Sequence, residues 1–266
     1  MKKPQLAMCN FIADIEELGR VAREQGFSGI DWSFDVHQLP DSPAAESRWI
    51  REISALQPLE IRYHCPFHQV DMGHDDHEEA QRAYKLFRRL ILLVSKAGGS
   101  YLTVHVGLGR DSTIPLSWER TIDNLRRLVE FGANYRVTIC LENLAWGWSS
   151  KPNLFEKLVR KSGAAVTFDL GHAFSSESVL SRQFTVEDFV IPHPDRVMNA
   201  HIYHRESSRS GHVPPESLID LEDRLGLLRE IGCRWWVIEM REINGLLATK
   251  RIIDSYLQQE ARVRAV

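Results

Sequence analysis

Short apolar runs alternate with longer amphipathic stretches along the chain. The runs are rich in β-branched and aromatic residues, which is typical of buried strands. This pattern predicts eight strands, at residues 5–9, 28–32, 59–64, 100–105, 137–142, 165–169, 197–202 and 235–239.

The stretches between the strands carry apolar residues at helical spacing. Three sets have members three or four residues apart: Ala83, Leu86, Leu90, Leu93 and Ala97; Ile122, Leu125 and Val129; and Leu221, Leu225, Leu228 and Ile231. Glycine follows several of these helices, as in EQGF, KAGG and EIGC, which matches a C-terminal glycine cap. The stretch at 181–190 has the weakest pattern and predicts a short or irregular helix.

Strand–helix alternation predicts a parallel sheet joined by crossover helices. Eight such units predict a single α/β domain over residues 1–266, folded as a closed (β/α)8 (TIM) barrel. The usual barrel size of about 250 residues suits this chain of 266. An open doubly wound sheet is the alternative, but it would usually carry a glycine-rich phosphate loop after its first strand. CNFIADIEELG has no GxGxxG, so we expect no nucleotide cofactor.

Composition and charge narrow the class of protein. The formal net charge is −3 with acids and bases mixed throughout, so neither nucleic acid nor a membrane surface is an expected partner. The four cysteines are far apart and form no CxxC pair. Three of them lie inside apolar runs, and we expect these to be reduced core residues. No apolar run approaches the roughly 20 residues of a membrane span, and MKKPQLAMCN does not begin a signal peptide. These features predict a soluble, cytoplasmic protein.

Six of the eight predicted strands finish with an imidazole or a carboxylate. These residues are His64, His105, Glu142, Asp169, His201 and Glu239. Each one alone is more typical of a structural histidine or a capping carboxylate than of a functional group. In a barrel, however, the carboxyl ends of all strands lie on one face, where active sites of this fold are built. We therefore expect the six side chains to surround one mouth.

Three carboxylates that face one cleft repel one another and raise each other's pKa unless a cation neutralises them. No lysine or arginine ends a strand, and the nearest in sequence, Arg241, lies two residues past Glu239. The simplest counter-charge is one divalent metal ion. Carboxylate and imidazole ligands suit Mn²⁺, Mg²⁺, Co²⁺ or Zn²⁺, and the absence of thiolates argues against a structural zinc site.

The stretch VTFDLGHAF, at residues 166–174, joins an apolar strand to an aspartate and a histidine. Its pattern predicts Asp169 at the carboxyl end of the strand and His172 in the turn beyond it. An aspartate that caps a turn beside a surface histidine is the alternative interpretation.

Six motifs at successive strand ends resemble those of a known superfamily. They are HCPF (64–67), VHVG (104–107), LEN (141–143), FDLGH (168–172), HIYH (201–204) and VIE (237–239). Their order and placement are similar to those of the xylose isomerase-like barrels. That superfamily includes sugar and sugar-phosphate isomerases and epimerases, inosose dehydratase and endonuclease IV. The resemblance covers nearly the whole chain.

The resemblance implies a role for each residue around the mouth. Four residues would bind one divalent metal: Glu142, Asp169, His201 and Glu239. By the resemblance, His172 would contact the substrate or the metal, and His64 and His105 would line the same pocket. Position in the sequence adds further candidates for substrate contact or support of the centre: His212, Asn143, Arg205, Trp32 and Trp146. Asn143 would orient Glu142, and a turn-forming asparagine is the alternative interpretation. A tryptophan could stack on a sugar ring, with packing beneath loops as the alternative.

Endonuclease IV is the nearest rival within the superfamily, because eight residues could occupy all but one of its metal positions. They are His64, His105, Glu142, Asp169, His172, His201, His212 and Glu239. The missing position is an aspartate two residues before His212, where this chain has Ser210. The first strand also lacks the histidine–serine and the paired glycines of that nuclease. The chain is therefore more similar to the sugar isomerase and epimerase branch.

The predicted function is that of a divalent-metal-dependent isomerase or epimerase of a sugar, a related polyol or a keto acid. A metal chelated by a hydroxyl and a neighbouring carbonyl oxygen acidifies the C–H between them and stabilises an enediolate. Glu142 and Glu239 would remove and return the proton. Dehydration or retro-aldol cleavage could use the same intermediate, so a lyase stays open. Two different functions stay open as well: an endonuclease IV-like zinc-dependent AP endonuclease, and a non-catalytic barrel that binds a small polyhydroxy ligand.

The exact substrate stays open at this stage. Sugar epimerases of this type usually carry a substrate-binding arginine six residues after the strand-seven histidine. This chain has Ser207 there, between Arg205 and Arg209. The expected partner is a small sugar-like molecule, and whether the chain forms a homo-oligomer is also open.

Overall fold

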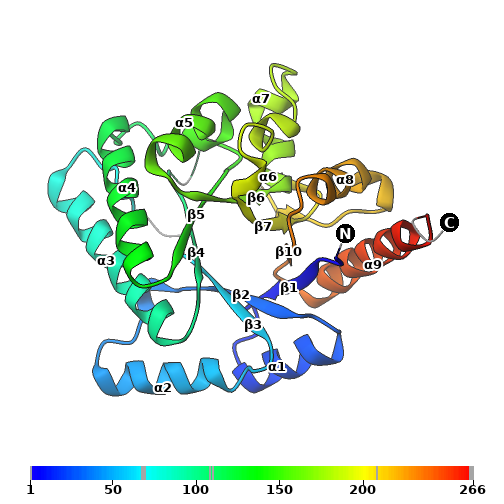
Figure 1. Cartoon of the computed structure of the whole chain (residues 1–266), viewed down its shortest axis with the longest axis horizontal. Helices are drawn as coiled ribbons and strands as arrows, with labels where there is room; N and C mark the ends of the chain where they lie inside the picture. Colours follow the sequence, from blue (N-terminus) through cyan, green and yellow to red (C-terminus); the bar gives the residue numbers. More distant parts are fainter. Residues whose placement is uncertain (1, 67–69, 108, 110, 208, 264–266) are drawn as a thin grey trace.

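Eight parallel strands close into a barrel that helices surround (Figure 1). The computed structural model describes residues 2–66, 70–107, 109, 111–207 and 209–263. The barrel strands are, in order, β1 (Gln5–Cys9), β2 (Gly29–Ser33), β3 (Glu60–His64), β4 (Tyr101–Val104), β5 (Thr138–Glu142), β6 (Ala165–Asp169), β7 (Val197–Ile202) and β10 (Trp235–Ile238). The predicted (β/α)8 barrel is confirmed. Each strand begins and ends within one residue of its predicted position. Phe67, which ends the HCPF motif, lies outside the described residues.

Helices pack on the outside of the barrel. The α-helices are α1 (Ile15–Glu24), α2 (Pro43–Ser54), α3 (His77–Lys96), α4 (Trp118–Asn134), α5 (Pro152–Ser162), α6 (Leu170–Ser175), α7 (Glu177–Leu180), α8 (Glu222–Glu230) and α9 (Ile243–Val263). Short 3₁₀ turns are η1 (Val36–Gln38), η2 (Trp148–Ser150), η3 (Glu187–Phe189), η4 (Pro194–Arg196) and η5 (Leu218–Asp220). The irregular sixth helical unit is confirmed, because two short helices and two 3₁₀ turns replace one long helix between β6 and β7.

The expected glycine caps are present at the ends of three helices. Gly26, Gly98 and Gly232 have φ angles of 70°, 78° and 74°, in the left-handed region that glycine enters without a steric penalty. Each one reverses the chain so that the next strand can begin a few residues later.

A polar layer fills the barrel below its mouth. The guanidinium of Arg62 donates to Asn199 Oδ1 at 2.5 Å and lies over the rings of Tyr101 and Trp235. Asn199 in turn donates to Thr167 Oγ1 at 2.9 Å. The interior is therefore packed with side chains, as in other barrels of this kind, and chemistry is confined to an end face.

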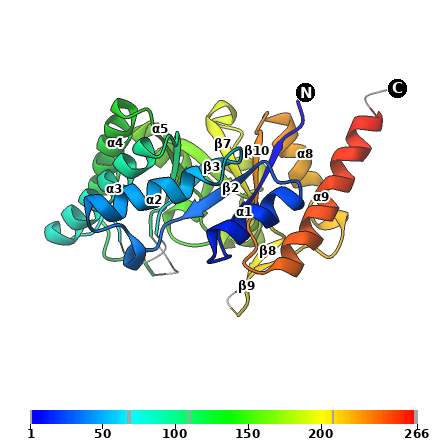
Figure 2. The ribbon, with the colours of Figure 1, turned by 90° about the horizontal axis from the view of Figure 1, so that it is seen from below.

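An antiparallel hairpin extends the barrel after β7. Its strands are β8 (Arg205–Ser207) and β9 (Gly211–Val213), and their register places Glu206 opposite His212. Figure 2 shows the hairpin projecting from the end at which the barrel strands finish. The hydrophobic pattern did not predict these strands, because each has only three residues and neither is buried.

Gly171 allows the ring of Tyr203 to pack directly on α6. A Cβ atom here would lie 2.1 Å from Cε2 of Tyr203. We expect Gly171→Ala to lower the free energy of unfolding by about 1–3 kcal/mol, the usual cost of overpacking, in urea denaturation. The matched control is Gly226→Ala in α8, where a Cβ would meet only the Tyr256 hydroxyl at 3.9 Å and should stabilise the helix. Unchanged stability of Gly171→Ala would contradict this packing.

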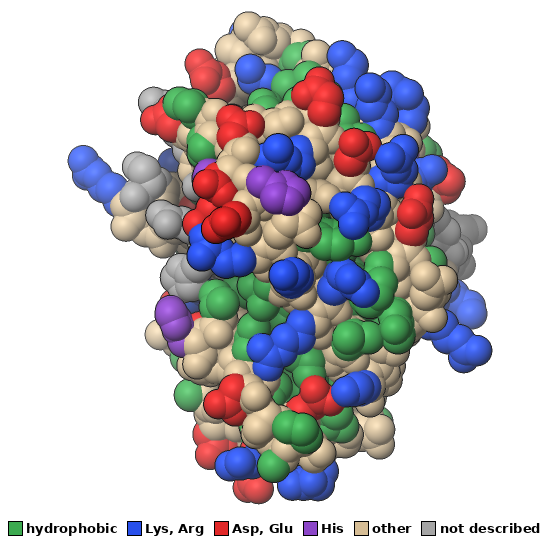
Figure 3. All heavy atoms as spheres, turned by 90° about the vertical axis from the view of Figure 1, so that its left-hand side faces the viewer, with side chains coloured by type: hydrophobic (Ala, Val, Ile, Leu, Met, Phe, Trp, Pro, Cys, Tyr) green, Lys and Arg blue, Asp and Glu red, His purple; other side chains and the backbone are tan. Residues whose placement is uncertain are grey.

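Charges of both signs are interspersed on the surface. Figure 3 shows Lys and Arg side chains among Asp, Glu and apolar side chains on the face that lies to the left in Figure 1. Among the described residues, no helix combines the length and apolar character needed to cross a membrane.

Candidate metal centre

Four predicted ligands converge at the carboxyl ends of neighbouring strands. Glu142 ends β5, Asp169 ends β6, His201 lies in β7, and Glu239 follows β10. Their ligand atoms all lie within 4.8 Å of one another, and all four residues are buried. His201 Nδ1 lies 3.1 Å from Glu142 Oε1 and 2.9 Å from Glu239 Oε2. The barrel thus gathers three carboxylates and one imidazole from four strand ends.

The charges in this cluster fit a bound cation. Burial raises the pKa of Asp169 well above its usual range, and the carboxylates of Glu142 and Glu239 add to the rise. Burial also opposes ionisation of the two glutamates, but the surrounding imidazoles, with His201 contributing most, together outweigh it and hold the pKa of both below the usual range. Asp169 Oδ2 and Glu239 Oε2 are buried and accept no hydrogen bond from the described residues. A divalent ion would coordinate both oxygens. Its positive charge would replace that of a protonated His201 imidazole.

Two further histidines bracket Glu142 from the side of β3 and β4. The Nε2 atoms of His64 and His105 lie 2.9 Å and 2.8 Å from Glu142 Oε2. Against the effect of burial, Cys65 and Glu142 raise the pKa of His105 to about 9. Both histidines thus lie at the mouth, where the sequence predicts them, and they contact the carboxylate of Glu142 directly.

Sequence reasoning missed two buried groups beside the centre. Cys65 Sγ lies 3.7 Å from His105 Nδ1, and this imidazole, working against burial, lowers the pKa of the thiol to about 6. Cys65 is free and buried, and the sequence did not predict its contact with His105. Asp31, in β2, is 1% exposed and lies 4.0 Å from His201 Nε2. This distance is too long for a hydrogen bond, but it places another buried carboxylate next to His201, and the IDW motif at this strand end was the available signal.

Asn143 connects β5 to β6 instead of orienting Glu142. Its Oδ1 accepts from the Asp169 backbone N–H at 2.8 Å, and its Nδ2 donates to the Asp169 carbonyl at 2.9 Å. The prediction for Asn143 is corrected accordingly, since these bonds hold the backbone of Asp169.

His172 lies in α6 and not in a turn, which corrects the second expectation for this stretch. Asp169 Oδ1 accepts from the His172 backbone N–H at 2.6 Å and so caps the helix. Asp169 is therefore a capping residue, as in the alternative interpretation, but His172 is buried and not on the surface. The other oxygen, Oδ2, faces the cluster, and its role as a metal ligand stays a prediction. His172 Nδ1 lies 3.2 Å from the Asn143 carbonyl oxygen.

The tryptophans divide between the mouth and the outer layer. Trp146 lies 5.7 Å from the ring of His172 and lines a groove of about 1350 Å³ together with Trp148 and Glu206. Trp32 instead packs edge-on against Trp49 of α2, 6.4 Å between ring centres, in the hydrophobic layer between strands and helices. The sequence-based substrate role for Trp32 is corrected to packing.

The β8–β9 hairpin places one more carboxylate at the mouth. Glu206 lies beside His172 and His212, and the three form a group of close ligand atoms. Ser210, where the sequence lacks the expected aspartate, is exposed on the hairpin. Arg205 is also exposed, and strand alternation directs its side chain to the face opposite Glu206.

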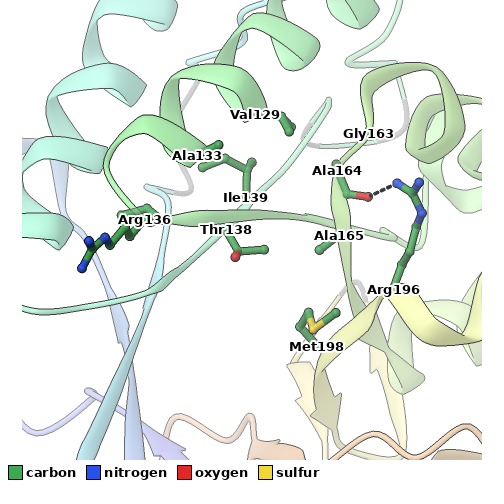
Figure 4. Close-up of a pocket in the computed structure, with 11 residues that line it drawn as sticks. Val129, Ala133, Arg136, Thr138, Ile139, Gly163, Ala164, Ala165, Arg196 and Met198 are labelled. Atoms are coloured by element: carbon green, nitrogen blue, oxygen red, sulfur yellow. Dashed lines mark hydrogen bonds between the residues drawn. The ribbon is translucent and has the colours of Figure 1, made fainter.

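A second cavity lies at the opposite end of the barrel (Figure 4). It measures about 390 Å³, and Thr138 and Ala165, which line it, begin β5 and β6. Arg196 donates there to the Ala164 carbonyl at 3.2 Å. Its described lining contains neither a carboxylate nor an imidazole, so it offers no ligands for a metal.

Fold and site define a (β/α)8 barrel with carboxylates and imidazoles gathered at its carboxyl-end mouth. The chain belongs to the xylose isomerase-like TIM barrel family, whose model matches residues 19–259. An uncharacterised protein of Methanocaldococcus jannaschii is 32% identical over 198 residues, which cover 74% of this chain and 80% of that protein. The resemblance inferred from the strand-end motifs is thereby confirmed.

Solved structures share the fold over almost the full length. A D-tagatose 3-epimerase-like protein has a TM-score of 0.73 and 18% identity, over 97% of this chain and 99% of that chain. Endonuclease IV from Thermus thermophilus has a TM-score of 0.70 and 18% identity, over 96% of this chain and 100% of that chain. At this identity the likeness establishes the fold, and the reaction has to be argued from the site.

Proposed function

We propose that the protein is a divalent-metal-dependent isomerase or epimerase of a small polyhydroxy carbonyl compound. The observation that carries the proposal is the convergence of Glu142 and Glu239 on His201, at 3.1 Å and 2.9 Å, beside the buried Asp169. Two carboxylates on either side of one cation are suited to removing and returning a proton on carbon.

The chain's own residues have distinct parts in this proposal. When bound, a divalent ion held by Glu142, Asp169, His201 and Glu239 would polarise neighbouring substrate oxygens and acidify the C–H between them. Glu239, whose Oε2 lies 2.9 Å from His201 Nδ1, is the proposed base.

Glu142 is suited to returning the proton. Its Oε1 contacts His201, and its Oε2 contacts His64 and His105, so these imidazoles can supply protons to the carboxylate. Trp146, at the adjoining groove, offers an indole face for a sugar ring.

A second candidate is metal-dependent hydrolysis of a phosphodiester, as the name endonuclease IV describes for one structural neighbour. The favouring observation is that the described residues form three groups of potential ligands beyond the four-ligand cluster: His64 with Cys65 and His105, His64 with Glu142 and His201, and His172 with Glu206 and His212. The net charge of −3 opposes it, because gripping a phosphodiester backbone depends mostly on cationic side chains.

Deuterium exchange separates these functions. We expect metal-loaded protein in D₂O to exchange hydrogen for deuterium at the carbon next to the carbonyl of at least one member of a ketose panel, as followed by NMR. A duplex with one abasic site should remain intact under the same conditions. Efficient nicking without exchange on any sugar would instead establish the nuclease. Absence of both activities would contradict both enzymatic functions and favour a binding protein.

A further inference from the structure

The groove that contains Trp146 is larger than one small sugar would fill. It measures about 1350 Å³ and extends from Trp146 and Glu206, beside the mouth, to α7 and the turn that follows it. Pockets that enclose a drug-sized ligand usually measure about 300–1,000 Å³. The proposed reaction at the four-ligand centre therefore leaves most of this groove without a purpose.

The irregular sixth helical unit forms one wall of the groove. α7 ends at Leu180, and the backbone N–H groups of Gln183 and Phe184 both donate to the Ser178 carbonyl at 3.1 Å. The chain thus turns back after a single helical turn and does not continue as a helix. Ser178 Oγ also donates to the Ser150 carbonyl at 2.6 Å, which ties this wall to η2. The weak helical pattern in the sequence therefore corresponds to a built wall beside the mouth.

A single residue separates the groove from the four-ligand centre. Glu206 Oε2 lies 4.0 Å from His172 Nε2, and His172 Nδ1 lies 3.2 Å from Asp169 Oδ2. The ring of Trp146 lies 5.7 Å from the ring of His172 on the same side. A molecule whose reactive carbon lies at the centre can therefore continue into the groove past His172 and Trp146.

The lining of the groove is suited to a molecule rich in hydroxyl groups. Neutral side chains supply most of its hydrogen-bonding groups: Ser150, Asn153, Ser175, Ser178, Ser181 and Gln183. Hydroxyl and amide groups both donate and accept, as the hydroxyl groups of a sugar do. Asn153 and Gln183 are exposed, and Phe184 adds an aromatic face on which a sugar ring can pack.

The charges of the lining argue against a phosphorylated ligand. Lys151 is the one cationic side chain of the described lining, and Glu177 and Glu206 oppose it. Sites that bind phosphate usually present arginine or several cationic groups. The part of a ligand that lies in this groove is therefore expected to be neutral.

We propose that the groove binds a second, neutral sugar unit that is linked to the ketose reacting at the metal centre. This inference rests on the proposed isomerase or epimerase function and narrows its substrate class to glycosylated ketoses. Trp146 would lie where the two units meet, and Asn153, Gln183 and Phe184 would contact the outer unit. Binding energy from a remote part of a substrate can be used to orient the part that reacts.

Binding affinity, measured separately from turnover, tests the groove. Isothermal titration calorimetry of the metal-loaded protein compares D-fructose with isomaltulose, maltulose and lactulose, three disaccharides whose fructose unit keeps its carbonyl group. We expect at least one disaccharide to bind about 10-fold more tightly than fructose, a difference of about 1.4 kcal/mol. If none of the three binds more tightly than fructose, the proposal is overturned.

Variants in the groove locate the second sugar unit. The double variant Asn153→Ala/Gln183→Ala alters two exposed side chains, so the fold should be kept, as checked by circular dichroism. We expect it to lose most of the difference in affinity between the disaccharide and fructose. Gln258→Ala, at an exposed position of α9, is the matched control and should keep that difference. A wild-type difference in the double variant would place the second unit elsewhere and refute the groove.

Deuterium exchange separates failure of this inference from failure of the proposed function. Tighter binding of a disaccharide without exchange on any ketose would support the groove and refute the isomerase or epimerase. Exchange on fructose without tighter binding of any disaccharide would support the function and refute the groove.

Discussion

Glu239→Gln is expected to lower the rate of proton exchange by at least about 100-fold, because an amide cannot accept the substrate proton. General acid–base groups typically contribute 10²–10⁴-fold to a reaction. Glutamine has nearly the same shape, so the buried position next to His201 should still be filled and the fold kept. The measurement is the initial rate of deuterium incorporation by NMR, with circular dichroism as the check on folding.

The matched control for this variant is Glu216→Gln, which should exchange at the wild-type rate because residue 216 is exposed. Metal analysis separates two roles of Glu239. Loss of exchange with metal content retained identifies the base, whereas loss of both identifies chiefly a ligand. Equal exchange rates in Glu239→Gln and wild type would refute the proposed proton transfer.

Removal of divalent metal is expected to abolish exchange and to lower thermal stability. Without a cation, three buried carboxylates share one small volume, and burial disfavours the ionised form of Asp169 in particular. A ligand at 100 times its dissociation constant stabilises the native state by about 2.7 kcal/mol. For a chain of this size that corresponds to roughly 5–10 °C in melting temperature.

Calorimetry of the chelated and reloaded protein measures this shift, and exchange should return on reloading. Asp169→Asn is the comparison variant, because a neutral amide weakens the ligand set and should reduce the gain in melting temperature. Full activity and an unchanged melting temperature in protein shown to be metal-free would contradict a metal-dependent mechanism.

The convergence of polar residues at the strand ends could be predicted from the sequence, because it depends only on the local pattern of each strand and on one general property of barrels. The apolar runs that end in Glu142, Asp169 and His201 identify strands without reference to any distant residue. Closure of the barrel then brings their carboxyl ends to one face. The four-ligand cluster follows from these two facts, although its role in metal binding and catalysis stays a prediction.

The direction of a side chain was harder to predict than its position in the chain. Trp32 and Asp31 are neighbours in β2, yet the indole packs outside the barrel and the carboxylate faces His201 inside. Adjacent strand residues point to opposite faces, so a shift of one residue exchanges the two roles. Asn143 was misjudged for a related reason, because its partner lies on the next strand and not on its own.

By itself, the sequence determined the alternation of strands and helices, the barrel that this alternation builds, and the polar residues at its strand ends. These follow from local periodicity and from the common direction of parallel strands. Only the tertiary structure decided that Glu206 stands opposite His212, where Ser210 left a carboxylate missing, and that Cys65 contacts His105. Both contacts depend on a hairpin register or on the spacing of neighbouring strands, which distant parts of the chain set together through packing.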